Sequence, residues 1–423
     1  MMKRRELNVL ISRFAFVLTS SFMMVMGINL SFFFFAYLLL LVVRSRGFGK
    51  FFLISGWLRI FVALFMFGIL ASMFYHFTIG NIMQVKSSLQ VIPNYIYWGI
   101  LILLFVNLGE LRCLNYSQLF MGVSCGAILA ILYYVLFQDF EFNKLFLKSF
   151  QKNNIAFLII CYTPYIVYTL KLKMHHLVAL AVLAAILFFQ LLDGRRAGFL
   201  LAMLGGLLAF RIDLLKFSSI FQILRPIAVA MVALFLLYTN FVEGFINSKS
   251  ERIHEVIYEL SDETISNDRS ILVRKAMVEK GLNIFRQNLL FGVGLNNFTK
   301  TEMAIEGNFV GAKYVVDKDI YERTSSHNSY INFLAEGGLS LAVPTVAIFL
   351  LLLVTAFKRF GSLKDPEKVI LVSFLLMCIH FYYMTSIVNS LAWFNIAMLA
   401  YVASCPRDDK ARRVHSNKAK IKK

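Results

Sequence analysis

The chain has 423 residues, of which 59% are hydrophobic and 16% are charged. This composition excludes an ordinary soluble domain and predicts an all-α polytopic integral membrane protein. The net charge is +19, but the segment from Glu243 to Gly338 holds 11 Lys and Arg against 14 Asp and Glu, so the rest carries +22. An excess confined to short loops and tails indicates cytoplasmic connections, and it argues against a nucleic-acid-binding surface.

The cysteines and the N-terminal region exclude two further classes. None of the five cysteines lies in the polar segment and no two form a CxxC pair; they are Cys113, Cys125, Cys161, Cys378 and Cys405. Neither a disulfide framework nor a zinc site is therefore predicted. No small-residue cleavage site interrupts the first apolar runs, so we expect no cleavable signal peptide.

In chain order, apolar runs predict about twelve transmembrane helices. The first two share residues 14–43, a stretch short enough that one long tilted helix is an alternative. The others are predicted at residues 51–74, 92–108, 119–137, 155–170, 177–192, 199–210, 220–242, 339–357, 369–387 and 391–403. The chain is thus divided into a bundle (1–242), a large loop (243–338), three last spans (339–403) and a basic tail (404–423).

Basic residues mark every second connection. They include Lys3, Arg4, Arg5, Arg44, Arg46, Lys50, Arg112, Lys171, Lys173, Arg211, Lys216, Lys358, Arg359, Lys364 and Lys368, together with the tail. The positive-inside rule then places both termini in the cytoplasm and the large loop outside it. The tail is expected to lie near anionic lipid head groups.

Two arginines break this charge rule. Arg195 and Arg196 fall in a short turn on the predicted outer face. One interpretation is snorkelling at the membrane interface. The other is an anion clamp, since guanidinium groups bind phosphate oxygens in a bidentate way.

The polar loop holds a second cationic element. Asn267-Asp268 is typical of a helix N-cap, and apolar residues follow at Ile271, Val278, Leu282 and Phe285, which predicts an amphipathic helix of about four turns. Arg269 is expected in its first turn, where free N–H groups also favour an anion. Arg274 either shares that role or is a solvated helix residue.

A turn and a histidine complete the loop. Gly292-Val293-Gly294 predicts a tight turn or a close backbone approach, and we interpret it as a structural hinge, with ligand contact as the alternative. Ser325-Ser326 is expected to cap a short helix that begins at His327 and ends at Glu336-Gly337-Gly338. The helix dipole would favour neutral imidazole, the form that a general base needs. Asn328 would orient the ring or a sugar hydroxyl; a purely structural loop histidine is the alternative.

Together these motifs resemble the bacterial O-antigen ligase and polymerase family. The resemblance rests on the arginine pair, the helix after Asn267, the Phe291-Gly292-Val293-Gly294 turn, and Ser326-His327-Asn328-Ser329-Tyr330 running to Glu336-Gly337-Gly338-Leu339. It covers about Leu192 to Leu350 by motif, and the remainder by topology. The turn at residues 195–198 reads Arg-Arg-Ala-Gly, which departs from the family pattern; Gly198 favours Arg195 as the functional arginine.

The resemblance implies an enzyme of the bacterial inner membrane that needs neither cofactor nor metal. It implies a GT-C-like, inverting glycosyl transfer from an undecaprenyl-pyrophosphate-linked glycan to a sugar hydroxyl. The catalytic residues would be His327, which activates the acceptor, and Arg269 and Arg195, which hold the pyrophosphate. Arg196, Arg274 and Asn328 would bind substrate. The partners would be the donor, a glycan or lipid A-core acceptor, membrane lipids and a chain-length regulator.

Three functions remain open at this stage. The Gly292 turn favours a repeat-unit polymerase, and an O-antigen ligase is the alternative with the same donor and another acceptor. A transporter or flippase is the alternative of a different class. Proton-coupled carriers place acidic residues within their spans, and no predicted span here contains one.

Overall fold

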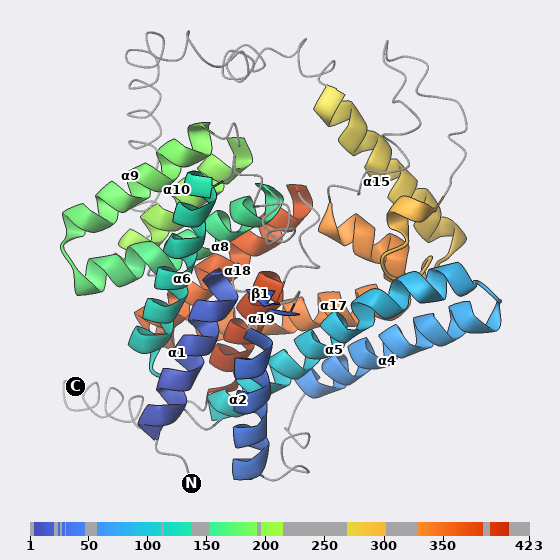
Figure 1. The fold of residues 1–423 in the computed structure, drawn as a ribbon, viewed down its shortest axis with the longest axis horizontal. Helices are drawn as coiled ribbons and strands as arrows, with labels where there is room; N and C mark the ends of the chain where they lie inside the picture. Colours follow the sequence, from blue (N-terminus) through green and yellow to red (C-terminus); the bar gives the residue numbers. More distant parts are fainter. Residues whose placement is uncertain are drawn as a thin grey trace, which may run out of the picture.

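The computed structural model describes residues 4–20, 24–25, 28–29, 31–46, 57–110, 114–137, 152–192, 196–214, 269–301, 328–383 and 390–405. Within these ranges the chain is a bundle of helices, with α15 and the start of α17 at the opposite side from the start of α1 (Figure 1). The long elements are α1 (Arg4–Ser20), α2 (Ser31–Arg46), α4 (Trp57–Thr78), α5 (Ile82–Glu110), α6 (Tyr116–Phe137), α8 (Lys152–Lys173), α9 (His176–Leu192), α10 (Arg196–Phe210), α15 (Arg269–Gln287), α17 (Ser329–Lys358), α18 (Asp365–Tyr383) and α19 (Ser390–Ser404).

Each predicted span corresponds to one of these helices, except the span at residues 220–242, which lies outside the described residues. The first apolar run contains two helices, α1 and α2, so the single tilted helix is wrong. Between them, the two-residue strands β1 (Met24–Val25) and β2 (Ile28–Asn29) pair antiparallel, with Met24 opposite Asn29. The all-α prediction did not include this pair.

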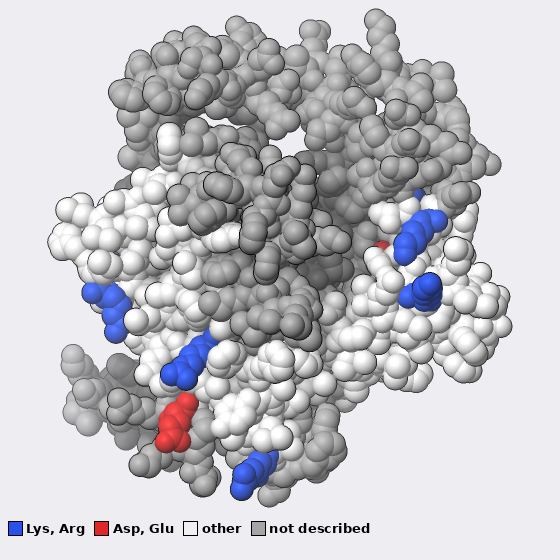
Figure 2. Space-filling model, viewed as in Figure 1, with Lys and Arg blue, Asp and Glu red and all other residues white. Residues whose placement is uncertain are grey.

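Five of the described helices are long and apolar enough to cross a bilayer: α4, α5, α6, α8 and α17. Shorter apolar stretches occur in α2, α9, α10 and α19. The face in Figure 2 carries few charges among its described residues. Large apolar side chains on the bundle are exposed, such as Phe67, Phe74 and Phe77 of α4, as expected for contact with lipid. The fold is that of a helical membrane protein, and twelve crossings stay a prediction.

Buried polar groups join the central helices. The Tyr165 hydroxyl of α8 donates to the Asn395 Oδ1 of α19 over 2.8 Å, and the Asn395 amide donates to Ser373 of α18 over 2.7 Å. Ser373 in turn donates to the Cys161 carbonyl. Interhelical hydrogen bonds of this kind fix which helix faces meet inside a membrane bundle.

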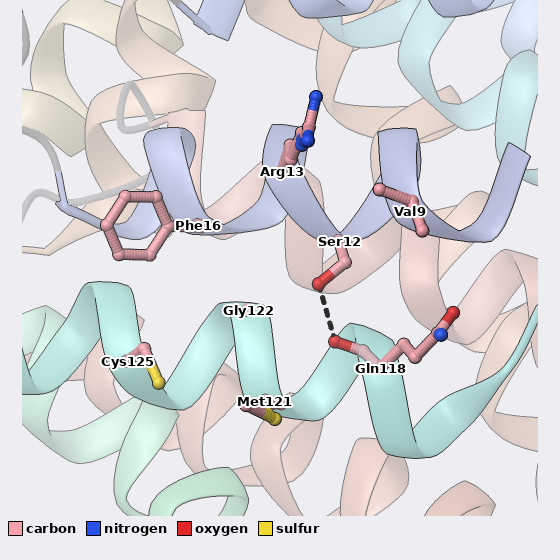
Figure 3. Close-up of a pocket in the computed structure, with 8 residues that line it drawn as sticks. All are labelled: Val9, Ser12, Arg13, Phe16, Gln118, Met121, Gly122 and Cys125. Atoms are coloured by element: carbon pink, nitrogen blue, oxygen red, sulfur yellow. Dashed lines mark hydrogen bonds between the residues drawn. The ribbon is translucent and has the colours of Figure 1, made fainter. Parts of the chain in front are cut away.

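A shallow pocket of about 410 Å³ lies between α1 and α6. Its lining is mostly apolar, and the Ser12 hydroxyl crosses it to donate to the Gln118 carbonyl over 2.7 Å (Figure 3). Arg13 lies at its edge and points away from α6 (Figure 3). The pocket is distant in sequence from the polar loop and contains none of the predicted site residues.

Contacts between helix ends agree with the predicted pattern of loops. Lys171 at the end of α8 bonds to Asp213, which follows α10, over 2.9 Å, and this bond holds the pKa of Asp213 below its usual value. Arg359 after α17 donates to the Cys405 carbonyl after α19 over 2.9 Å. Asn8 near the start of α1 accepts from the Asn115 N–H before α6. Each contact joins connections that the charge pattern assigned to one face.

Candidate functional site

The predicted site residues are only partly described. Arg195 and His327 lie outside the described residues. Arg196 is the first residue of α10, and Arg269 is the first residue of α15, with Arg274 in the second turn. The structure describes the backbone of these three arginines but not their side chains. Asn328 is described in full.

The start of α17 differs from the prediction. The N-cap is Asn328, not Ser325 or Ser326, and the helix begins at Ser329. The Asn328 Oδ1 accepts hydrogen bonds from the backbone N–H groups of Tyr330 and Ile331, over 3.0 and 3.1 Å. An asparagine side chain reaches the free N–H groups of the first turn as well as serine does, which explains the shift. His327 therefore precedes the cap and is not in the first helical turn, where the helix dipole was expected to favour neutral imidazole.

Asn328 thus has a structural role that the sequence analysis did not assign. Its side chain is 7% exposed, and its carbonyl oxygen is used by the helix. Contact with a sugar hydroxyl stays a prediction.

The buried face of α15 is also different from the predicted one. The helix itself is confirmed. Among its described side chains (277–287) the buried ones are Met277, Lys280, Gly281 and Ile284, and the side chain of the predicted apolar residue Ile271 lies outside the described part. The predicted apolar positions Val278, Leu282 and Phe285 are half-buried, on a face turned by about 100°. The predicted apolar face is therefore not the one that packs on α17. The packed face combines Met277 and Ile284 with a glycine and a lysine stem, which a hydrophobicity pattern does not count.

This face packs against the first turns of α17. A Cβ on Gly281 would overlap the Cγ2 atom of Ile331, so the two helices approach closely at this point. Beside it, the Lys280 side chain is 1% exposed and its Nζ lies 5.3 Å from the centre of the Phe298 ring. A cation over an aromatic face stabilises a buried charge.

The two glycine motifs lock together. The N–H groups of Val293 and Gly294 donate to the carbonyls of Ala335 and Glu336, each over 3.0 Å. In the other direction, the N–H groups of Leu339 and Ser340 donate to the carbonyls of Leu289 and Leu290, over 2.8 and 2.9 Å. The prediction of a close backbone approach at this turn is therefore confirmed.

Both sides of this junction need glycine. Gly292 has φ 63° and Gly338 has φ 58°, in the left-handed region that disfavours other residues. A Cβ on Gly338 would lie 2.6 Å from the backbone nitrogen of Gly292. The same residue kinks α17, and the apolar span begins beyond the kink.

The side chain of Glu336 occupies a backbone nest in the turn. Its Oε1 accepts from the N–H of Phe298 over 3.1 Å, and the N–H groups of Asn296 and Asn297 and the Asn332 side chain also bond to this carboxylate. The nest forms because Asn296 adopts φ 61°, which turns successive N–H groups toward one point. Glu336 is 5% exposed, so these donors replace the water that a carboxylate normally holds.

The turn is anchored to α4 and α5. Ser72 donates to the Phe291 carbonyl over 2.9 Å, and Ser88 donates to the Leu295 carbonyl over 3.1 Å. The Asn297 amide donates to the Gln84 carbonyl over 3.1 Å. His76 of α4 lies beneath the turn, 2% exposed, with the backbone of Phe291 and Gly292 beside its ring. These contacts hold the turn against the end of α4 and the start of α5.

The arrangement brings the predicted groups on α15 and α17 to one end of the same unit. The two segments run parallel here. Gly281 faces Ile331, and nine residues after each of them the Leu290 carbonyl accepts from the Ser340 N–H. At about 100° per residue, Arg269 and Arg274 fall about 70° to either side of the centre of the α15 face that packs on α17. Along α15, Arg274 and Arg269 lie seven and twelve residues before Gly281, about 10 and 18 Å, whereas Asn328 lies three residues before Ile331. His327 precedes Asn328 in the sequence and lies outside the described residues.

The sequence analysis missed several residues of this unit. The sequence predicted Glu336 only as the end of a helix, and it predicted no role for Lys280 or His76. The position of Glu336, directly before two glycines and an apolar span, could have indicated its role. An acidic side chain there is solvated unless backbone N–H groups bind it.

A comparison with protein families now adds to this geometry. Residues 179–343 match the family model described as O-antigen ligase. This part of the chain is similar to the O-antigen ligase family. The matched range contains Arg195, Arg196, Arg269, Arg274, His327 and Asn328, together with α9, α10, α15 and the interlocked turn.

The resemblance found in the sequence is therefore confirmed. This similarity supports glycan transfer in the assembly of O-antigen or a related polysaccharide at a membrane. A search of curated proteins gives no match.

Proposed function

We propose that the protein transfers a glycan from an undecaprenyl-pyrophosphate carrier to a sugar hydroxyl outside the cytoplasm, as a repeat-unit polymerase. The proposal is supported by the parallel α15–α17 unit, because the two α15 arginine positions and the residue before Asn328 all lie on the same side of the Gly281–Ile331 contact. The face of α15 turned away from α17, with Val278 and Leu282 half-buried, suits the membrane surface where such a donor resides.

The arginines would act on the leaving group. Cleavage of the bond between sugar and carrier leaves charge on the pyrophosphate, and fixed guanidinium groups stabilise that charge without reorganising. Arg269 and Arg274 would do so from α15, and Arg195, with Arg196 beside it, from the connection before α10. The free N–H groups at the start of α15 would add to this field.

His327 would act on the acceptor. A general base contributes about 10²- to 10⁴-fold to the rate of a transfer of this kind. The imidazole would take the proton from the attacking hydroxyl as the new glycosidic bond forms, and the pyrophosphate would leave on the opposite face, with inversion at the anomeric carbon. Neither step needs a metal or a cofactor.

The large loop is proposed to be extracytoplasmic and the protein to lie in the bacterial inner membrane, with both termini in the cytoplasm. The helix-end contacts of Lys171 and Arg359 support a single basic face. A ligase that uses a lipid A-core acceptor would share the donor site. A flippase would move the same donor unchanged.

One reconstitution separates these functions. Proteoliposomes would receive a pyrophosphate-linked repeat unit, and the products would be resolved by chain length and by release of the free lipid diphosphate. A ladder made from donor alone supports a polymerase, and transfer only on addition of lipid A core supports a ligase. Movement of donor with no diphosphate release would refute enzymatic transfer. His327→Ala should abolish release, whereas His175→Ala, an exposed histidine next to α9, should not.

A further inference from the structure

Glu336 is a buried carboxylate whose hydrogen bonds come from another part of the chain. The donors are the N–H groups of Asn296, Asn297 and Phe298, which belong to the turn after α15, whereas Glu336 belongs to α17. These bonds join α17 to the turn through a side chain, in addition to the backbone bonds between the two segments.

The junction does not depend on this carboxylate for its closure. Four backbone hydrogen bonds already hold the turn against residues 335–340. A buried charge is costly to retain, and well-packed apolar residues often replace buried ionic groups without loss of stability. A carboxylate at this place therefore suggests a need for orientation, which directional charged hydrogen bonds supply.

Its effect would reach His327 through a short, rigid path. From Glu336 the helix runs back without interruption to Ser329 and its cap Asn328. His327 is the residue before that cap in the sequence. On the way, Ile331 rests against Gly281 of α15. A rotation of these first turns of α17 would move His327 relative to Arg269 and Arg274.

We propose that Glu336 is a positioning residue for glycan transfer: held in the nest at Asn296–Phe298, it fixes the first turns of α17 and so the place of His327 relative to the arginines of α15. This inference rests on the proposed function. A displacement of about 1 Å between reacting groups lowers a rate by about 10²-fold, while binding of a distant part of the substrate changes little. The expected signature is therefore a lower kcat with an unchanged KM for the donor.

The test compares Glu336→Gln with the parent protein in proteoliposomes supplied with the pyrophosphate-linked repeat unit. Glutamine keeps the size of the side chain, but it replaces one acceptor oxygen by an NH2 group that faces N–H donors. We expect kcat to fall by at least tenfold and KM for the donor to stay within about twofold, with the same amount of folded protein. An unchanged kcat in folded Glu336→Gln protein would overturn the inference.

Asn332→Ala provides a second variant, because it removes one side-chain donor to the carboxylate and leaves the backbone nest intact. We expect the same signature at about three- to tenfold, between the parent and Glu336→Gln. If Glu336→Gln does not fold, this variant decides: an unchanged kcat overturns the inference. Failure of the proposed function would be seen separately, as no diphosphate release by the parent protein.

Discussion

Gly281 of α15 and Ile331 of α17 are in direct contact, so the two helices that carry the candidate groups approach closely at this point. No side chain on Gly281 is compatible with the observed position of Ile331. The contact thus sets the spacing between α15, which contains the two arginine positions, and the N-cap Asn328, which follows His327 in the sequence.

Gly281→Leu should separate these helices. Overpacking of this kind costs about 1 to 3 kcal/mol, and here it would also widen the site. We expect a lower thermal unfolding midpoint in detergent and a loss of glycan transfer. Gly361→Ala is the matched control, because nothing lies within 4 Å of the position where its Cβ would stand. Full activity of Gly281→Leu would mean that the spacing of α15 and α17 is irrelevant to the reaction.

Gly338→Ala should destabilise the protein more than Gly80→Ala. Both glycines have positive φ, 58° and 77°, so both substitutions carry backbone strain of about 1 kcal/mol. A Cβ at Gly338 also lies 2.6 Å from the Gly292 nitrogen and the Leu290 carbonyl, whereas the space around Gly80 is open. Thermal unfolding of the two variants measures the difference, and equal midpoints would show that the junction tolerates separation.

Asn328→Ala should lower the free energy of unfolding by about 0.5 to 2 kcal/mol, because the first turn of α17 loses its cap. Asn328→Ser should retain most of that stability, since a hydroxyl also caps helices. Denaturation of both variants checks the order. If Asn328→Ser is as stable as the parent yet fails in transfer, the amide has a substrate-binding role in addition to capping.

Arg274→Ala and Arg269→Ala should weaken use of the pyrophosphate-linked donor by about 10- to 100-fold in kcat/KM, as expected for the loss of one charged hydrogen bond. Arg286→Ala is the control on the same helix, because Arg286 is exposed and its guanidinium bonds to the nearby Asn283. Steady-state kinetics with saturating acceptor provide the measurement. Retention of parental kcat/KM by both variants would remove the clamp from the mechanism.

Chelation should leave transfer unchanged if guanidinium groups alone stabilise the leaving diphosphate. The rate in proteoliposomes should remain within about twofold after dialysis against EDTA. Recovery of a lost rate on addition of Mg²⁺ or Mn²⁺ would require a metal in the mechanism.

The sequence by itself determined the class of the protein, the placement of its apolar helices and the family that residues 179–343 resemble. These follow from composition, run length and short motifs, which depend on neighbours along the chain. Tertiary structure decided the buried face of α15, the cap at Asn328 and the place of Glu336. Each of these depends on a contact between segments far apart in sequence: Gly281 admits Ile331, and three backbone N–H groups receive a carboxylate. The glycines predicted a close backbone approach at residues 292–294, but patterns of side-chain hydrophobicity contain no information about backbone donors. Only the tertiary structure therefore showed that residues 335–340 are the partner of this turn.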